Sequence, residues 1–122
     1  MKVAITAKTN SIESEIDTRF GRCGYFLIID TDNLDFRSIN NSSAMASGGA
    51  GIKAAQTIAN TGVKVVITDN IGPNAFETLK AADIKIYKVD NGTIKDVIAK
   101  YKNGELEEIK SASVGNHFGM KV

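Results

Sequence analysis

Two arginines and a cysteine stand close together in the segment Arg19-Phe20-Gly21-Arg22-Cys23-Gly24. Guanidinium groups bind anions through several N–H donors at once. The charge of Arg19 and Arg22 would also lower the pKa of the Cys23 thiol, and a thiolate is a good ligand for a soft metal. The segment therefore predicts an anion site made by Arg19, Phe20, Gly21 and Arg22 beside a metal-binding Cys23. The alternative is that Cys23, which directly precedes a strand pattern, is a small buried hydrophobic residue.

A second candidate binding element is the run Gly48-Gly49-Ala50-Gly51, which opens a helical pattern. Backbone without side chains lets an anion approach exposed N–H groups, and the helix dipole favours negative charge at this end. The spacing matches neither the phosphate-loop nor the dinucleotide-binding fingerprint. Two interpretations therefore stay open: Gly48, Gly49 and Gly51 bind an anion, or they form a flexible hinge before a helix.

Further candidates come from the second half of the chain. Asn70 and Asn74 flank Gly72-Pro73 and either donate amide N–H groups to the same ligand or only satisfy a turn. His117 is the single histidine and is a candidate metal ligand beside Cys23, with a solvated tail side chain as the alternative. One cysteine and one histidine cannot hold a closed zinc site or a complete iron–sulfur cluster.

Apolar strand patterns alternate with amphipathic helical patterns along the chain. Strands are predicted at residues 2–7, 25–30, 35–40, 63–67 and 84–89, with helices that begin near residues 52, 73 and 93. The polar turn after residue 30 favours a hairpin, and the later strand–helix alternation favours parallel strands. We expect a three-layer α/β/α sandwich around a five-stranded mixed sheet. Ligands bind beyond the carboxyl ends of such strands, where the three candidate segments should converge.

Length and composition set limits on function. The 122 residues fit one domain, predicted at 1–110, with a polar flexible tail at 111–122. The 15 basic and 14 acidic side chains leave no basic excess, which argues against nucleic-acid binding. No signal-peptide pattern or membrane-length apolar run is present, and a single cysteine is typical of a reducing cytoplasm. The first strand pattern lacks a carboxylate for metal-dependent hydrolysis, and no serine or cysteine has an evident base, so we expect no enzyme activity.

Three separated motifs, at residues 19–26, 48–52 and 70–76, resemble the dinitrogenase iron–molybdenum cofactor biosynthesis family. The resemblance runs from residue 2 to about residue 104. It implies a ribonuclease-H-like fold with strand order 3-2-1-4-5 and an antiparallel second strand. It also implies that the protein transiently binds and carries an anionic metal–sulfur cluster or an iron–molybdenum cofactor precursor. The implied partners are cluster-assembly or acceptor proteins.

One position departs from the pattern of that family. Nitrogenase-dedicated members place a histidine directly before the Phe-Gly pair, where this sequence has Arg19. The chain is therefore more similar to stand-alone members from archaea and anaerobic bacteria. The alternative function is a regulatory module that binds a small anionic metabolite, without metal, in the cleft where the three candidate segments are expected to converge.

Overall fold

Six strands form one mixed sheet in the computed structural model, which describes residues 1–42, 44 and 49–112. The sheet order is β3-β2-β1-β4-β5-β6, and β1 pairs antiparallel with β2 and parallel with β4. The parallel pair β4 and β5 carries the antiparallel β6 at its outer edge. The strands are β1 (Lys2–Ala7), β2 (Tyr25–Asp30), β3 (Phe36–Asn40), β4 (Val65–Thr68), β5 (Lys85–Lys88) and β6 (Glu107–Glu108).

The predicted mixed α/β sheet is confirmed, with β1 inside it and β2 antiparallel to β1. The expected count of five strands is wrong, because β6 adds a short sixth strand beside β5. Glu108 pairs with Tyr87, and the backbone N–H of Ile109 donates to the carbonyl of Ile86 at 2.7 Å. Two glutamates carry no apolar strand pattern, so only the pairing reveals β6. The ribonuclease-H-like relationship stays a prediction.

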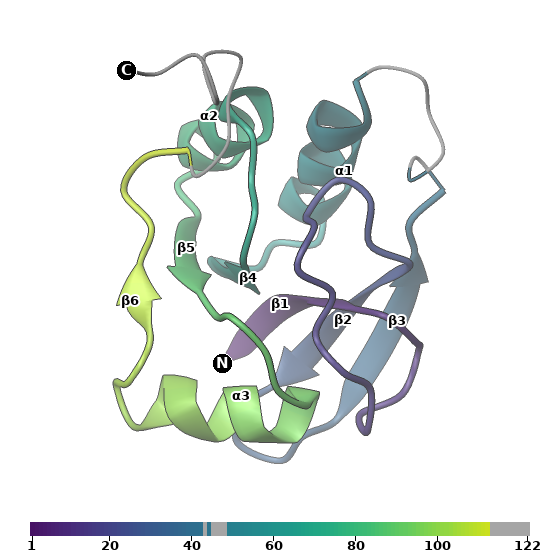
Figure 1. The fold of residues 1–122 in the computed structure, drawn as a ribbon, viewed down its shortest axis with the longest axis vertical. Coiled ribbons are helices and arrows are strands. Elements are labelled where there is room, and N and C mark those ends of the chain that lie inside the picture. Colours follow the sequence, from purple (N-terminus) through teal and green to yellow (C-terminus); the bar gives the residue numbers. More distant parts are fainter. Residues whose placement is uncertain (43, 45–48, 113–122) are drawn as a thin grey trace.

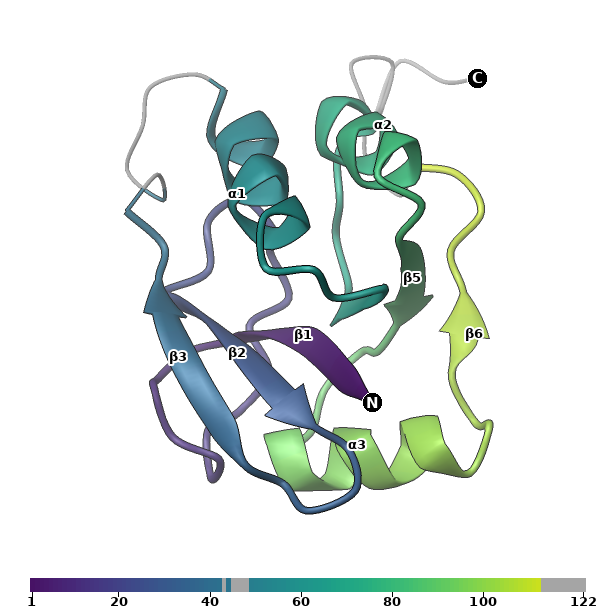
Figure 2. The same cartoon turned by 180° about the vertical axis from the view of Figure 1, so that it is seen from behind.

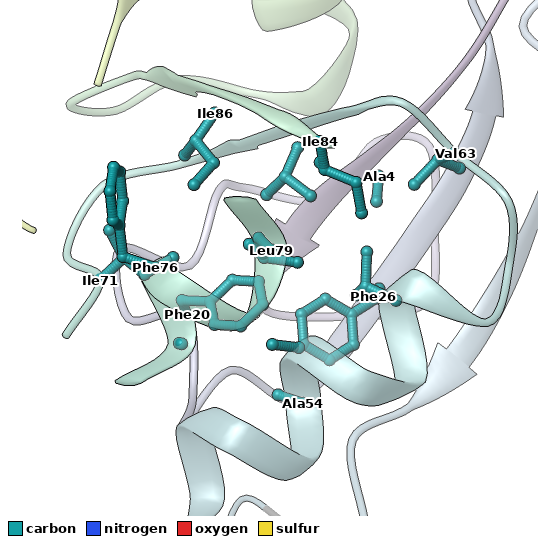
Figure 3. Packing of buried hydrophobic residues seen from close by; sticks show 14 of the residues in the cluster. Ala4, Phe20, Phe26, Ala54, Val63, Ile71, Phe76, Leu79, Ile84 and Ile86 are labelled. Carbon is teal, nitrogen blue, oxygen red and sulfur yellow. The ribbon is translucent and has the colours of Figure 1, made fainter. Parts of the chain in front are cut away.

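In the described part of the chain, three helices cover the two faces of the sheet. The helices α1 (Ala50–Ala59) and α2 (Pro73–Ala81) lie side by side on one face, and α3 (Ile94–Lys102) lies across the other (Figures 1 and 2). Each face has its own apolar cluster. In the cluster under α1 and α2, Phe20 and Phe26 approach each other with ring centroids 5.4 Å apart (Figure 3). The expected three-layer arrangement is therefore present.

The connections explain why a site forms at one sheet edge. Because β3 is antiparallel to β2, and β2 to β1, strands β1 and β3 point the same way as β4. The helix α1 follows β3 and α2 follows β4, so both helices begin near the edge where these strands end. Among the described residues no helix has the length and apolar character needed to cross a bilayer. Most of the predicted tail, residues 113–122, lies outside the described part of the chain.

Candidate functional site

A cleft of about 410 Å³ opens between the N-termini of α1 and α2. The segment 19–22 forms its third wall and is tied to the end of β4 by backbone hydrogen bonds. The N–H of Phe20 donates to the carbonyl of Asn70 at 3.0 Å, and the N–H of Asn70 donates to the carbonyl of Thr18 at 2.7 Å. The lining residues are Arg19, Phe20, Gly21, Arg22, Gly49, Ala50, Gly51, Ile52, Asn70, Gly72, Pro73, Asn74 and Ala75.

The structure thus brings together nearly all the residues that the sequence analysis predicted for ligand binding. Asn70 and Asn74 are exposed at the cleft, next to Gly49 and Gly51. Gly48 and His117 lie outside the described residues, so their predicted roles are not placed. The convergence predicted from the strand ends is confirmed, whereas binding by each residue stays a prediction.

Small residues allow the three walls to approach each other closely. A Cβ atom on Gly21 would lie 3.1 Å from both the Cα and the N of Gly51, in the first turn of α1. A Cβ atom on Gly51 would in turn lie 3.3 Å from the Cβ of Ala75 in α2. A distance of 3.1 Å is shorter than most Cβ contacts, so a side chain at position 21 would require the backbone of α1 to shift.

Both helix N-termini at the cleft lack side-chain caps and acidic residues. The N-cap residues are Gly49 for α1 and Gly72 for α2, and the first turn of each helix contains no Asp or Glu. Gly49 adopts the left-handed conformation with φ 71°, which glycine reaches without strain. The first N–H groups of a helix have no partner within the helix, and the dipole makes this end positive. The cleft can therefore accept an anion from two directions.

Arg19 is exposed at the cleft but is paired with a buried carboxylate. Its Nε and Nη2 donate to Oδ1 and Oδ2 of Asp17, each at 3.2 Å, and its backbone N–H donates to Oδ1 at 3.0 Å. The hydrogen bond and the charge of Asp17 raise the pKa of the Arg19 guanidinium. The buried negative charge of Asp17 therefore partly neutralises the positive charge that was predicted for this side of the cleft.

The backbone of Asp17 is held at the end of β1 by Thr6. The Thr6 hydroxyl donates to the carbonyl of Asp17 at 2.6 Å and lies 3.0 Å from the Thr68 hydroxyl, with both threonines fully buried. The N–H of Asp17 donates to the carbonyl of Thr6 at 3.0 Å. Asp17 was not among the site residues predicted from the sequence, although an aspartate that accepts from the backbone N–H two residues later is a known turn signal.

Asn41 organises the other half of the same turn and was also missed. This buried side chain donates from Nδ2 to the carbonyls of Gly21 at 3.1 Å and Cys23 at 2.9 Å. Arg22, the second predicted arginine, is exposed and donates from Nη1 to the carbonyl of Ala44 at 2.7 Å. A single asparagine after a strand gives no distinctive sequence signal, so only the fold shows what Asn41 binds.

Cys23 and Phe20 belong to the core beneath the cleft. The Cys23 side chain is fully buried, and Phe20 is 1% exposed. The lowered thiol pKa that the arginines predicted is wrong, because burial, followed by the charge of Asp17, raises the pKa of Cys23 to about 12. The opposing effect of Arg19 is smaller. A metal role for Cys23 stays a prediction that requires the thiol to become accessible.

We expect a Cys23→Ala variant to lose about 1–2 kcal/mol of folding free energy, since it leaves a small cavity in the core. Anion binding by the folded variant should stay within about twofold of the parent protein. The thiol pKa is higher in the folded than in the unfolded chain, so its contribution to stability is present below pH 9 and lost towards pH 12. Urea unfolding across this range checks the result, because only the parent protein should show this alkaline loss.

A second hollow, of about 370 Å³, lies near β5 and β6 and holds none of the predicted site residues. Its charged lining is mixed and contains Lys88, Lys100, Asp90, Glu105 and Glu107. Lys88 lies 3.3 Å from Asp90 and 3.9 Å from Asp69, and these contacts raise its pKa. Three carboxylates beside two lysines do not favour an anion, so the candidate anion site is the cleft at α1 and α2.

The sequence and the fold are similar to those of known proteins. A Methanocaldococcus jannaschii protein, MJ0580, is 32% identical over 113 residues, which cover 90% of this chain and 92% of that protein. The apo form of the orange protein from Desulfovibrio gigas superposes with a TM-score of 0.87 at 32% identity, covering 92% of this chain and 95% of that one. A Thermotoga protein solved by NMR gives a TM-score of 0.80 at 38% identity, covering 92% and 96%. The dinitrogenase iron–molybdenum cofactor family matches residues 1–104, and this chain belongs to that family.

Proposed function

We propose that this protein binds an anionic metal–sulfur cluster, or an iron–molybdenum cofactor precursor, in the cleft between α1 and α2 and carries it to an acceptor. One observation carries the proposal: two helix N-termini without acidic residues converge on a cleft that also exposes Arg19 and Arg22. Helix N-termini and guanidinium groups both favour bound anions. The family adds a role in the handling of a metal cofactor.

The donor set suits a cargo that brings its own sulfur ligands. The cleft offers N–H groups from backbone, arginine and amide side chains, while the thiol of Cys23 is closed off in the core. A cluster whose metals are already saturated by sulfide needs charge and hydrogen bonds from the protein more than new metal ligands. Weak, non-covalent binding also permits release, as a carrier requires. We further propose that the protein works in the cytoplasm with cluster-assembly or acceptor proteins and has no enzyme activity of its own.

A second candidate function is a regulatory module for a small anionic metabolite. The burial of Cys23 favours it, since a site of N–H donors serves a phosphate or a carboxylate as well as a sulfide cluster. The two functions differ in the ligand that binds. Anaerobic titration with tetrathiomolybdate, in parallel with inorganic phosphate and pyrophosphate, separates them. Preferential binding of the thiomolybdate supports the carrier, and preferential binding of a phosphate supports the metabolite module.

We expect an Arg22→Ala variant to bind tetrathiomolybdate about threefold to tenfold more weakly than the parent protein at low salt. The difference should shrink at high ionic strength, because salt screens the attraction between exposed charges. The matched control is Arg37→Ala, which removes the same charge from β3, outside the cleft. Absorbance titrations at several salt concentrations measure both.

Equal weakening by Arg22→Ala and Arg37→Ala would mean that net charge alone attracts the anion. Such a result would contradict the cleft as the binding site. An absence of thiomolybdate binding to the parent protein, at any salt concentration, would reject the carrier function itself.

A further inference from the structure

We propose that Asp17 is a positioning residue that aims Arg19 at the cleft and limits the attraction of the cleft for its anion. The inference rests on the proposed anion-binding function and deepens it. Asp17 does not line the cleft itself; it acts through the guanidinium that does. The consequence would be a site that holds its cargo by directed N–H donors and still lets it leave.

The hydrogen bonds at Asp17 fix one orientation of Arg19. Both carboxylate oxygens accept from the same guanidinium, and Oδ1 accepts from the Arg19 backbone N–H as well. Such two-point pairing is planar and restricts the rotation of the arginine side chain. It uses Nε and Nη2, so Nη1 remains on the side away from the carboxylate. Arg19 is thereby held in one direction before a ligand arrives.

The two charges of the pair differ sharply in their exposure. The side chain of Asp17 is 6% exposed, whereas that of Arg19 is 63% exposed. The backbone of Asp17 is locked to Thr6 at the end of β1 by two hydrogen bonds, so the carboxylate cannot follow the arginine into the cleft. An anion in the cleft therefore meets the guanidinium first and has the negative charge behind it.

The carboxylate of Asp17 lowers the attraction between Arg19 and a distant anion more than the attraction between Arg19 and an anion in contact with it. At contact distance the nearer guanidinium dominates, because Coulomb energy falls with distance. Further away, the opposite charges of Asp17 and Arg19 largely cancel. A buried carboxylate is also screened little by salt, so its opposition to a bound anion persists under physiological conditions.

The test is an Asp17→Asn variant, which keeps the size of the side chain and an acceptor for the Arg19 backbone N–H. With tetrathiomolybdate as the probe, we expect about threefold to tenfold tighter binding, mainly through faster association, and a steeper dependence on salt. Asp83→Asn is the matched control: it removes the same charge from an exposed turn beyond the far end of α2 and should change affinity less than twofold. Stopped-flow measurements give both rate constants.

The outcomes separate this inference from the proposed function. A parent protein that binds no thiomolybdate overturns both. Binding by the parent that is unchanged or weakened in Asp17→Asn overturns only the role of Asp17, as does an equal gain in Asp83→Asn. If Asp17→Asn does not fold, Arg19→Gln and Arg22→Gln decide: each removes one positive charge, and the first should weaken binding more than the second because Asp17 holds only the Arg19 guanidinium in one orientation. Equal losses overturn the inference.

Discussion

A Gly21→Val variant is expected to lose about 3 kcal/mol or more of folding free energy and, with it, the anion-binding cleft. The first side-chain carbon would lie 3.1 Å from two backbone atoms of Gly51. A neighbouring side chain could rotate away, but the backbone of a helix can only move together with its helix. The variant must therefore push α1 away from the segment 19–22, which widens the cleft and exposes the core around Phe20.

Urea unfolding and anion titration of Gly21→Val measure the two effects. Gly62→Ala is a suitable control, since position 62 lies beyond the end of α1 and outside the cleft, and a Cβ there would meet no atom within 4 Å but would be strained at φ 83°. Its expected cost is about 1–2 kcal/mol, with binding retained. Similar losses in both variants, or a stable Gly21→Val protein with parental affinity, would show that the close approach of the two walls is not required.

An Asn41→Ala variant is expected to lose about 2–4 kcal/mol of stability and to bind the anion less tightly. The substitution removes the donor shared by the carbonyls of Gly21 and Cys23, and both acceptors lose that partner in a region where water has little access. The turn would then relax towards solvent, taking Arg22 away from its position in the cleft.

The neighbouring residue provides the comparison for Asn41. Asn40 has the same side chain but is exposed at the end of β3, and Asn40→Ala should cost less than about 0.5 kcal/mol. Thermal and urea unfolding of both variants check the stability, and titration checks the affinity. A small loss in Asn41→Ala would mean that other contacts hold the turn, and would remove Asn41 from the residues that shape the cleft.

The sequence by itself determined the order and type of the main elements and the three segments of the site. Alternating apolar patterns predict β1, β2, β4 and β5 because each must bury its side chains in the sheet, and Pro73 and Thr93 mark helix starts through local backbone chemistry. The glycine motifs predict where the backbone N–H groups are not covered by side chains. Such features depend on neighbours in the chain, so a single sequence is enough to show them.

Only the tertiary structure decided what the site residues face. Cys23 lies next to an arginine in sequence, yet burial determines its pKa, and burial depends on residues far along the chain. Arg19 is paired with Asp17 because the fold places the Asp17 backbone against Thr6 at the end of β1, which leaves the carboxylate facing the Arg19 guanidinium. The short β6 exists only because β5 offers it a free edge. The electrostatic environment, exposure and hydrogen-bond partners of a side chain depend on contacts between residues far apart in the sequence. Those contacts form only when the chain folds.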